Sequence, residues 1–339
     1  MADHSQMRLG KRPRRRDERT LKLARYLTGT LPPAPAAVDY TRGVTDWGVM
    51  LNDRLGCCTI AAVGHAVQTW KLNAGAAKAE LGAGSSAAGA GSPAARCAHG
   101  AEGCDAGICQ CGGGCNGVLP AANSLPAIPD STILEYYEKW DGYNPADPTS
   151  DQGGVEIDVL NDWRQQAFAG HTLDAYVAID LRSSSGSGAA APAIAAAVWL
   201  FGGAYIGIEL PVAAQDQDVW DVSATPGPDD EPGSWGGHAV YVVGYDLGLT
   251  IADGRWSIEK PPANSRSAIA QAQSKIVNRQ STITCITWGQ PKKMTLAWFE
   301  KYCSEAYALV SKDWLNAGGI SPSGFDLATL ERDLALVTA

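Results

Sequence analysis

The stretch "NDRLGCCTIAAVGHA", residues 52–66, places two adjacent cysteines immediately before an apolar run. From Ile60 to Trp70 an apolar residue recurs at every third or fourth position, which predicts a helix. Cys58 stands where the loop meets this helix, and a helix N-terminus offers unpaired N–H groups that would stabilise a thiolate. Cys57 comes one residue earlier, on the loop, so we expect its side chain to point elsewhere.

A nucleophilic cysteine also needs a base, because a free thiol with a pKa of about 8.5 is mostly protonated at neutral pH. His238 is the best candidate among the five histidines. It lies in "GSWGGHAVYVVGYD", where glycines precede a buried strand. His65 shares the helix with Cys58, but the helical rise would separate the two by roughly 10 Å. We therefore expect Cys58 and His238 to form a catalytic pair.

Three segments resemble papain-like cysteine peptidases. Asn52 precedes Cys58 by six residues, as a Gln precedes the nucleophile in that family; "GGHAVYVVGY" resembles the histidine strand; and "ITWG", residues 286–289, resembles the family's Asn-Ser-Trp-Gly. The resemblance implies that Cys58 is the nucleophile, His238 its partner, and Asn52 an oxyanion donor together with the Cys58 N–H. It also implies an α+β, two-lobed fold in which a helical lobe carrying the cysteine helix packs against a β-barrel-like lobe carrying the histidine strand.

The sequence departs from the family pattern around the histidine. Asn52 is one methylene shorter than Gln. The orienting Asn of the family falls at Ile286, whose side chain forms no hydrogen bond, and in a strand Thr287 would point to the opposite side. We therefore expect apolar contact with residues 286–288, including Trp288 over the ring, to hold His238 with no carboxylate or amide bonded to it.

Composition separates a basic arm, 1–30, from the rest of the chain, 31–339, and the resemblance implies that this remainder is a papain-like domain. Inserts are expected at 74–129, which is rich in Ala, Gly and Ser, and at 252–284, which is polar. Regular structure is expected elsewhere: helices over 131–143 and 153–168, a helix then a strand in "APAIAAAVWLFGGAYIGIELP", a strand in "HAVYVVGYD", a short helix then a strand in "TLAWFEKYCSEAYALVS", and a C-terminal helix in "SGFDLATLERDLALV".

The first insert contains the cysteine-rich stretch "RCAHGAEGCDAGICQCGGGC". Its spacing does not match a zinc-ribbon pattern. Disulfides, a zinc or copper(I) ion and free thiols all remain open, so we assign no metal and expect no cofactor. The cysteines concerned are Cys97, Cys104, Cys109, Cys111 and Cys115. Cys285 and Cys303 lie in apolar segments and are expected in the core.

Charge is unevenly distributed along the chain, whose formal net charge is −9. Residues 1–25 hold nine basic and three acidic residues, which leaves a body of formal charge −15. The arm is expected to be solvated, and contact with nucleic acid is an alternative for the arm alone, because the acidic body argues against a general nucleic-acid binder. No apolar run is long enough for a membrane span, and the first residues lack a signal-peptide core. We expect a cytoplasmic protein, with secretion by a non-classical or phage route left open.

Two function classes fit these observations. The first is a thiol hydrolase, a cysteine endopeptidase that cleaves peptide or protein substrates through Cys58 and His238. The second is a catalytically inactive papain-fold component of an assembly such as a phage particle, favoured by Ile286 in the orienting position and by the basic arm. Either would suit a bacterial or phage protein. A cell-wall endopeptidase ranks lower, because the sequence contains no recognisable wall-binding repeat.

Overall fold

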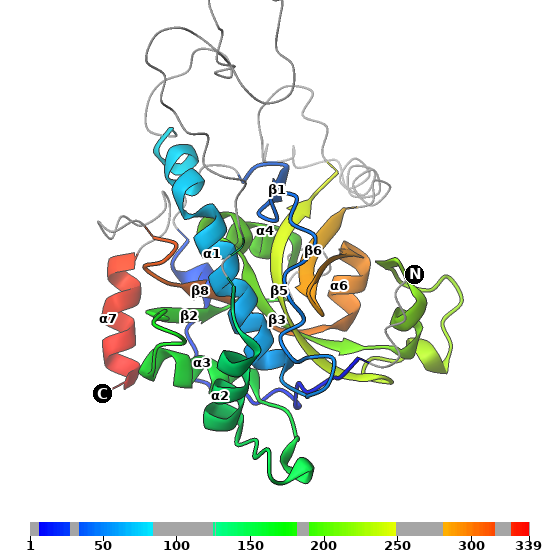
Figure 1. Ribbon diagram of the computed structural model, residues 1–339. Coiled ribbons are helices and arrows are strands. Elements are labelled where there is room, and N and C mark those ends of the chain that lie inside the picture. Colours follow the sequence, from blue (N-terminus) through cyan, green and yellow to red (C-terminus); the bar gives the residue numbers. More distant parts are fainter. Residues whose placement is uncertain are drawn as a thin grey trace, which may run out of the picture.

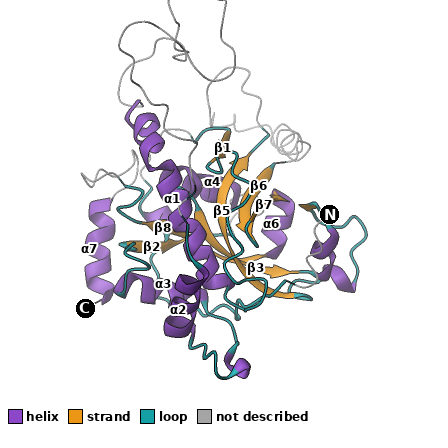
Figure 2. Ribbon diagram, in the orientation of Figure 1, coloured by secondary structure: helices purple, strands orange, loops and turns teal. Residues whose placement is uncertain are grey.

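The computed structural model describes residues 7–27, 34–83, 125, 127–181, 190–248, 281–315 and 327–338, which form a mixed α+β fold (Figures 1 and 2). The helices are α1 (Cys58–Ala83), α2 (Asp130–Asp141), α3 (Glu156–Gln165), α4 (Ala190–Phe201), α6 (Leu296–Tyr302) and α7 (Leu327–Thr338). The strands are β1 (Ala37–Asp39), β2 (Ala175–Ala178), β3 (Ala204–Leu210), β4 (Val219–Trp220), β5 (Gly236–Asp246), β6 (Thr282–Thr287), β7 (Gln290–Thr295) and β8 (Cys303–Val310).

The described strands form one sheet in the order β2-β8-β3-β5-β6-β7-β4, with β1 also paired to β5. All pairs are antiparallel except β4 with β7. Strand β5 is the longest, and its residues Ala239–Tyr245 are buried, as expected for a strand rich in valine and tyrosine. The register places His238 of β5 opposite Ile208 of β3.

Helix α1 is the buried centre of the fold, and Figure 1 shows it lying across the sheet beside β5 and β3. Every residue from Cys58 to Trp70 is buried. Most of these side chains are small or apolar, and the polar Thr59, His65 and Thr69 form hydrogen bonds within the protein. Trp70 anchors the middle of the helix: its ring stacks on Trp163 of α3 with centroids 5.5 Å apart, and its Nε1 donates to the carbonyl of Phe201.

Most of the expected elements are confirmed. The helices over 131–143 and 153–168 are α2 and α3, the helix–strand pairs are α4–β3 and α6–β8, and α7 is the C-terminal helix. The inserts need correction at their edges: α1 continues to Ala83, and β6 begins at Thr282, inside the segment expected to be irregular. Residues 84–124, 126 and 252–280 of the inserts lie outside the described residues, and so do the five cysteines from Cys97 to Cys115.

The expectation of a fully solvated arm is wrong for its first described part. Residues 7–14 lie against the body, and the side chain of Lys11 has no exposed surface. Arg12, Arg14 and Arg16 do remain exposed. Burying one amine while its neighbours stay in water requires a specific acidic partner for that amine. None of the described helices is long and apolar enough to cross a membrane.

The buried helix gives a stability prediction. Ile60 has no exposed surface, so Ile60→Ala should lower the free energy of unfolding by about 2–5 kcal/mol through lost burial and a cavity. Leu336 of α7 is 78% exposed, and Leu336→Ala should change it by less than about 0.5 kcal/mol. Urea unfolding followed by circular dichroism measures both. Equal effects of the two substitutions would contradict the central position of α1.

Candidate active site

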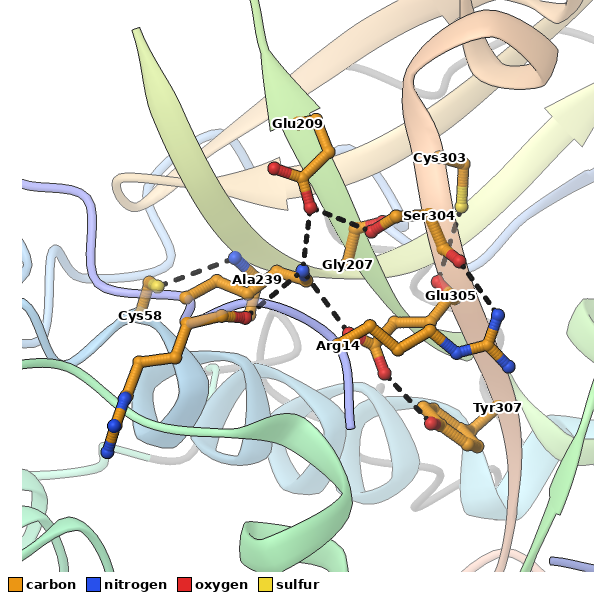
Figure 3. A network of polar contacts seen from close by, with 11 residues as sticks. Arg14, Cys58, Gly207, Glu209, Ala239, Cys303, Ser304, Glu305 and Tyr307 are labelled. Carbon is orange, nitrogen blue, oxygen red and sulfur yellow. Dashed lines mark hydrogen bonds and ion pairs between the residues drawn. The ribbon is translucent and has the colours of Figure 1, made fainter. Parts of the chain in front are cut away.

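Cys58 is the first residue of α1 and is 1% exposed. Its Sγ accepts a hydrogen bond from the backbone N–H of Ala239 at 3.4 Å, seen in Figure 3, and another from the backbone of Gly10. Burial raises the pKa of the Cys58 thiol to about 12, although both hydrogen bonds act in the opposite direction. The thiol of the neighbouring Cys57 donates a hydrogen bond to the carbonyl oxygen of Met50 at 3.4 Å, so its side chain points elsewhere, as expected.

His238 lies on β5 next to Ala239 and is 1% exposed. Its Nε2 lies 2.8 Å from Oγ1 of Thr287, and its Nδ1 is buried without a hydrogen-bond partner among the described residues. Burial, with a smaller effect from nearby His65, lowers the pKa of His238 to about 3. The imidazole is therefore neutral in the closed chain.

The hairpin between β6 and β7 covers this imidazole. Trp288 stacks on the His238 ring with centroids 4.7 Å apart and planes 18° apart, as expected. Trp288 and Gly289 form the two-residue turn, with φ of 47° and 78°. Positive φ at both positions is typical of a type I′ hairpin, but it is strained for a tryptophan. A side chain at Gly289 would also collide with Gly48, whose carbonyl carbon lies 2.8 Å from the position of a Cβ.

The expected orientation of Thr287 is wrong. Ile286, 1% exposed, packs in the core, and Thr287 turns to the side on which His238 lies. The alternation of side chains along a strand holds, but the position that faces the histidine is one residue later than the resemblance implied. The Thr287 hydroxyl thus lies at Nε2 of His238, where the resemblance had implied Ile286. Neither a carboxylate nor an amide bonds Nε2 among the described residues.

Asn52 lies in the loop before α1 and is 2% exposed. Its Nδ2 donates to the carbonyl oxygens of Leu55 at 3.2 Å and Arg8 at 3.3 Å. Trp288 Nε1 donates to the same Arg8 oxygen at 3.4 Å. Asn52 therefore already presents one N–H to the carbonyl of a peptide, but that peptide belongs to the chain's own arm.

Residues 7–14, which we call the N-terminal strap, run as an extended peptide across the site. Lys11 N donates to Gly237 O at 3.1 Å, beside His238. On the other side Gly154 N donates to Gly10 O at 2.8 Å, and Arg12 N donates to Gly154 O at 2.8 Å. The strap is thus hydrogen-bonded on both sides, as a bound peptide would be.

Glycines make room for the strap next to Cys58. A Cβ at Gly10 would lie 1.7 Å from the carbonyl oxygen of Gly56, and a Cβ at Gly153 would lie 1.8 Å from that of Gly10. A Cβ at Gly237 would lie 2.3 Å from Lys11 O. Contacts this close admit no side chain, so the strap approaches the backbone on both sides of the thiol. Sequence reasoning missed these residues, although glycine in a run of basic residues is the signal at Gly10.

The other cysteines singled out from the sequence do not take part in the Cys58–His238 site. Cys285 is buried in the core, as expected, and Cys303 is only half-buried. Both are free, and the described residues contain no group of three or more His, Cys, Asp or Glu arranged to hold a metal ion. The possible metal ligands Cys97, Cys104, Cys109, Cys111 and Cys115 lie outside the described residues.

Comparison with known proteins finds similarity among solved structures. No family model matches the chain, and a search of curated proteins finds no relative. Among solved structures the chain is similar to xylellain, a cysteine protease from Xylella fastidiosa, with 12% identity and a TM-score of 0.46 over 90% of this chain and 96% of that chain. The likeness is distant, so the functional argument rests on the site itself.

The burial of Cys58 predicts how its reactivity depends on pH. The thiolate is the reactive form, and a raised pKa means that it forms only at high pH. Alkylation of Cys58 by iodoacetamide should therefore be slower than that of a free small thiol throughout pH 6–10 and should rise only above that range. Peptide mapping by mass spectrometry measures the rate at Cys58. Fast labelling near neutral pH would contradict a thiol sealed beneath the strap.

Proposed function

We propose that the chain is a papain-like thiol hydrolase, a cysteine endopeptidase in which the lobe carrying α1 packs against a lobe carrying β5 and its neighbours. The observation that carries the proposal is the hydrogen bond from Ala239 N to Cys58 Sγ. It joins the first residue of α1 to the residue beside His238, whose ring is fixed by Thr287 and Trp288. A thiol, an oriented imidazole and a nearby amide donor are the groups that acyl transfer requires.

The chemistry follows from the free nitrogen of the imidazole. With Nε2–H donating to Thr287 Oγ1, Nδ1 accepts the proton of Cys58, and the thiolate attacks the carbonyl carbon of the scissile bond. The oxyanion receives hydrogen bonds from Cys58 N–H and Asn52 Nδ2. The imidazolium then protonates the leaving amine, and water deprotonated by His238 hydrolyses the thioester to release the acid and restore the thiol.

The strap has to leave before a substrate can bind. It presents the backbone N–H of Gly10 to the sulfur, while the Gly10 carbonyl points to Gly154. The Gly10 carbonyl is therefore turned away from the sulfur, and at this residue Cys58 meets an N–H group and not a carbonyl carbon. Departure of the strap would admit water and lower the pKa of Cys58 towards the pH at which the pair works. Substrates are peptides or proteins, and we keep a cytoplasmic location as part of the proposal.

The closed strap can be opened by one substitution in the full chain. A side chain at Gly10 collides with Gly56, so Gly10→Val should displace the strap and give hydrolysis of fluorescein-labelled casein at least about tenfold above that of the native chain. Cys58→Ser and His238→Ala, each in the Gly10→Val chain, should reduce the rate to background. Faster alkylation of Cys58 in Gly10→Val confirms independently that the site is open.

One outcome would favour the assembly component instead. If Gly10→Val alkylates fast at Cys58 but hydrolyses neither casein nor a mixed peptide library, the pair is accessible and inactive. The papain fold would then serve binding or structure, and the proposal would be wrong.

Thr287 offers a test of how the imidazole is oriented. In the Gly10→Val chain, Thr287→Val should lower kcat/KM by about tenfold or more, because the ring loses the acceptor of its Nε2–H. Thr287→Ser keeps that hydroxyl and should retain most of the rate. The hydroxyl stabilises the imidazolium, so its loss should also shift the alkaline limb of the kcat/KM profile to lower pH. An unchanged profile in Thr287→Val would contradict this role.

A further inference from the structure

The side chain of Lys11 fills a pocket of three glutamates close to Cys58. Its Nζ lies 2.9 Å from Oε1 of Glu209, 3.2 Å from Oε1 of Glu305 and 3.3 Å from the carbonyl oxygen of Arg12. Glu156, the first residue of α3, is the third carboxyl. We call Glu156, Glu209 and Glu305 the glutamate pocket; they come from α3, β3 and β8.

The body of the protein holds two of these carboxylates in place without help from the strap. Ser304 donates to Oε1 of Glu209 at 3.1 Å, and Tyr307 donates to Oε2 of Glu305 at 2.8 Å (Figure 3). Gly207 on β3 provides the space between them: a Cβ there would lie 2.1 Å from Lys11 Cε and 2.8 Å from both oxygens of Glu156. The pocket is therefore shaped for an unbranched chain ending in a donor group.

The charge of the pocket also requires a cation. Glu156 is fully buried, and neither of its carboxylate oxygens has a hydrogen-bond partner among the described residues. Burial and the proximity of Glu305 raise the pKa of Glu156 well above its usual value. Burial by itself would lower the pKa of Lys11, but the three glutamates raise it above its usual value. A buried acidic cluster without an amine would be an uncompensated charge, which a protein does not tolerate cheaply.

The pocket lies one residue from the nucleophile along the bound peptide. The backbone of Gly10 bonds Cys58, and Lys11, the next residue, inserts its side chain among the glutamates. Figure 3 draws the Ala239–Cys58 hydrogen bond and the contacts of Glu209 with Ser304 in one view. Any extended peptide that replaces the strap along the same backbone contacts brings a side chain to this pocket.

We propose that the glutamate pocket is the specificity pocket of this site and selects substrates with a lysine at the position that enters it. This inference rests on the proposed function, since only a hydrolase has a substrate here. The recognition of lysine by the pocket is independent of catalysis. The strap holds the cleft closed by presenting the same side chain that a substrate presents. The three glutamates lie far apart in sequence, at 156, 209 and 305, so no local sequence motif predicts the pocket.

The strap itself provides the first test in the full chain. Lys11→Met removes the amine and keeps a chain of similar length, so the strap should detach more readily and alkylation of Cys58 at pH 8 should rise at least about tenfold. Arg16→Met removes an exposed positive charge from the same arm and should leave the rate within about twofold, because exposed charges contribute little. Equal rates in the two variants would overturn the pocket's role.

The second test uses the opened chain, Gly10→Val with Cys58→Ala, and a labelled peptide of sequence MRLGKRPR. Fluorescence anisotropy should show binding at least about tenfold tighter than for the same peptide with norleucine in place of the lysine. Glu305→Gln should reduce this preference, with circular dichroism confirming that the variant is folded. Equal binding of the two peptides would contradict the proposal.

Hydrolysis separates this proposal from the proposed function. With Cys58 restored, a library in which lysine and norleucine alternate at the pocket position should be cleaved mainly at lysine peptides. Preferential binding of lysine without any cleavage would support the pocket and refute the peptidase. Cleavage without a preference for lysine would support the peptidase and refute the pocket.

Discussion

The hydrogen bond between Ala239 N–H and Cys58 Sγ is the contact on which the site depends. It joins the first turn of a helix that is buried on every side to the longest strand of the sheet. Because α1 cannot shift without exposing apolar surface, the sulfur is fixed against β5. The position of His238 in the sheet is then fixed as well, because it is the residue next to Ala239 on the same strand. The hairpin that carries Thr287 and Trp288 then needs only to close over the ring, and the strained φ at Trp288 is consistent with a turn held there by its neighbours.

Burial gives this site an unusual electrostatic state. The pKa of Cys58 is raised to about 12 and that of His238 is lowered to about 3, so both members of the pair are neutral in the closed chain. The same low-polarity environment would stabilise neither a lone thiolate nor a lone imidazolium. The strap contributes directly, because it covers the sulfur and offers it the N–H of Gly10. In the proposed function, reactivity is therefore governed by access of water and substrate to the pair, and the strap controls that access.

Sequence reasoning located the helix that begins at Cys58 and the strand that carries His238, next to the residue whose N–H bonds Cys58, since each of these depends on local patterns. The periodic run after Cys58 and the glycines before His238 are signals within a dozen residues. Thr287 was placed on the wrong side because a one-residue offset in a strand reverses which face a side chain takes. Sequence reasoning did not predict the glutamate pocket or the burial of Lys11, because the carboxylates meet only when α3, β3 and β8 pack together.

The central claim is that the strap occupies the position of a substrate over a competent thiol. A crystal structure of the full chain reacted with a peptide aldehyde that carries lysine at the pocket position tests it most directly, because an aldehyde carbon adds to a nucleophilic thiolate. The account predicts density continuous from Cys58 Sγ to the aldehyde carbon, residues 7–14 displaced from the cleft, and the lysine of the inhibitor among Glu156, Glu209 and Glu305. An unmodified Cys58 beneath an undisturbed strap, found after prolonged reaction in both the native chain and the Gly10→Val chain, would contradict it.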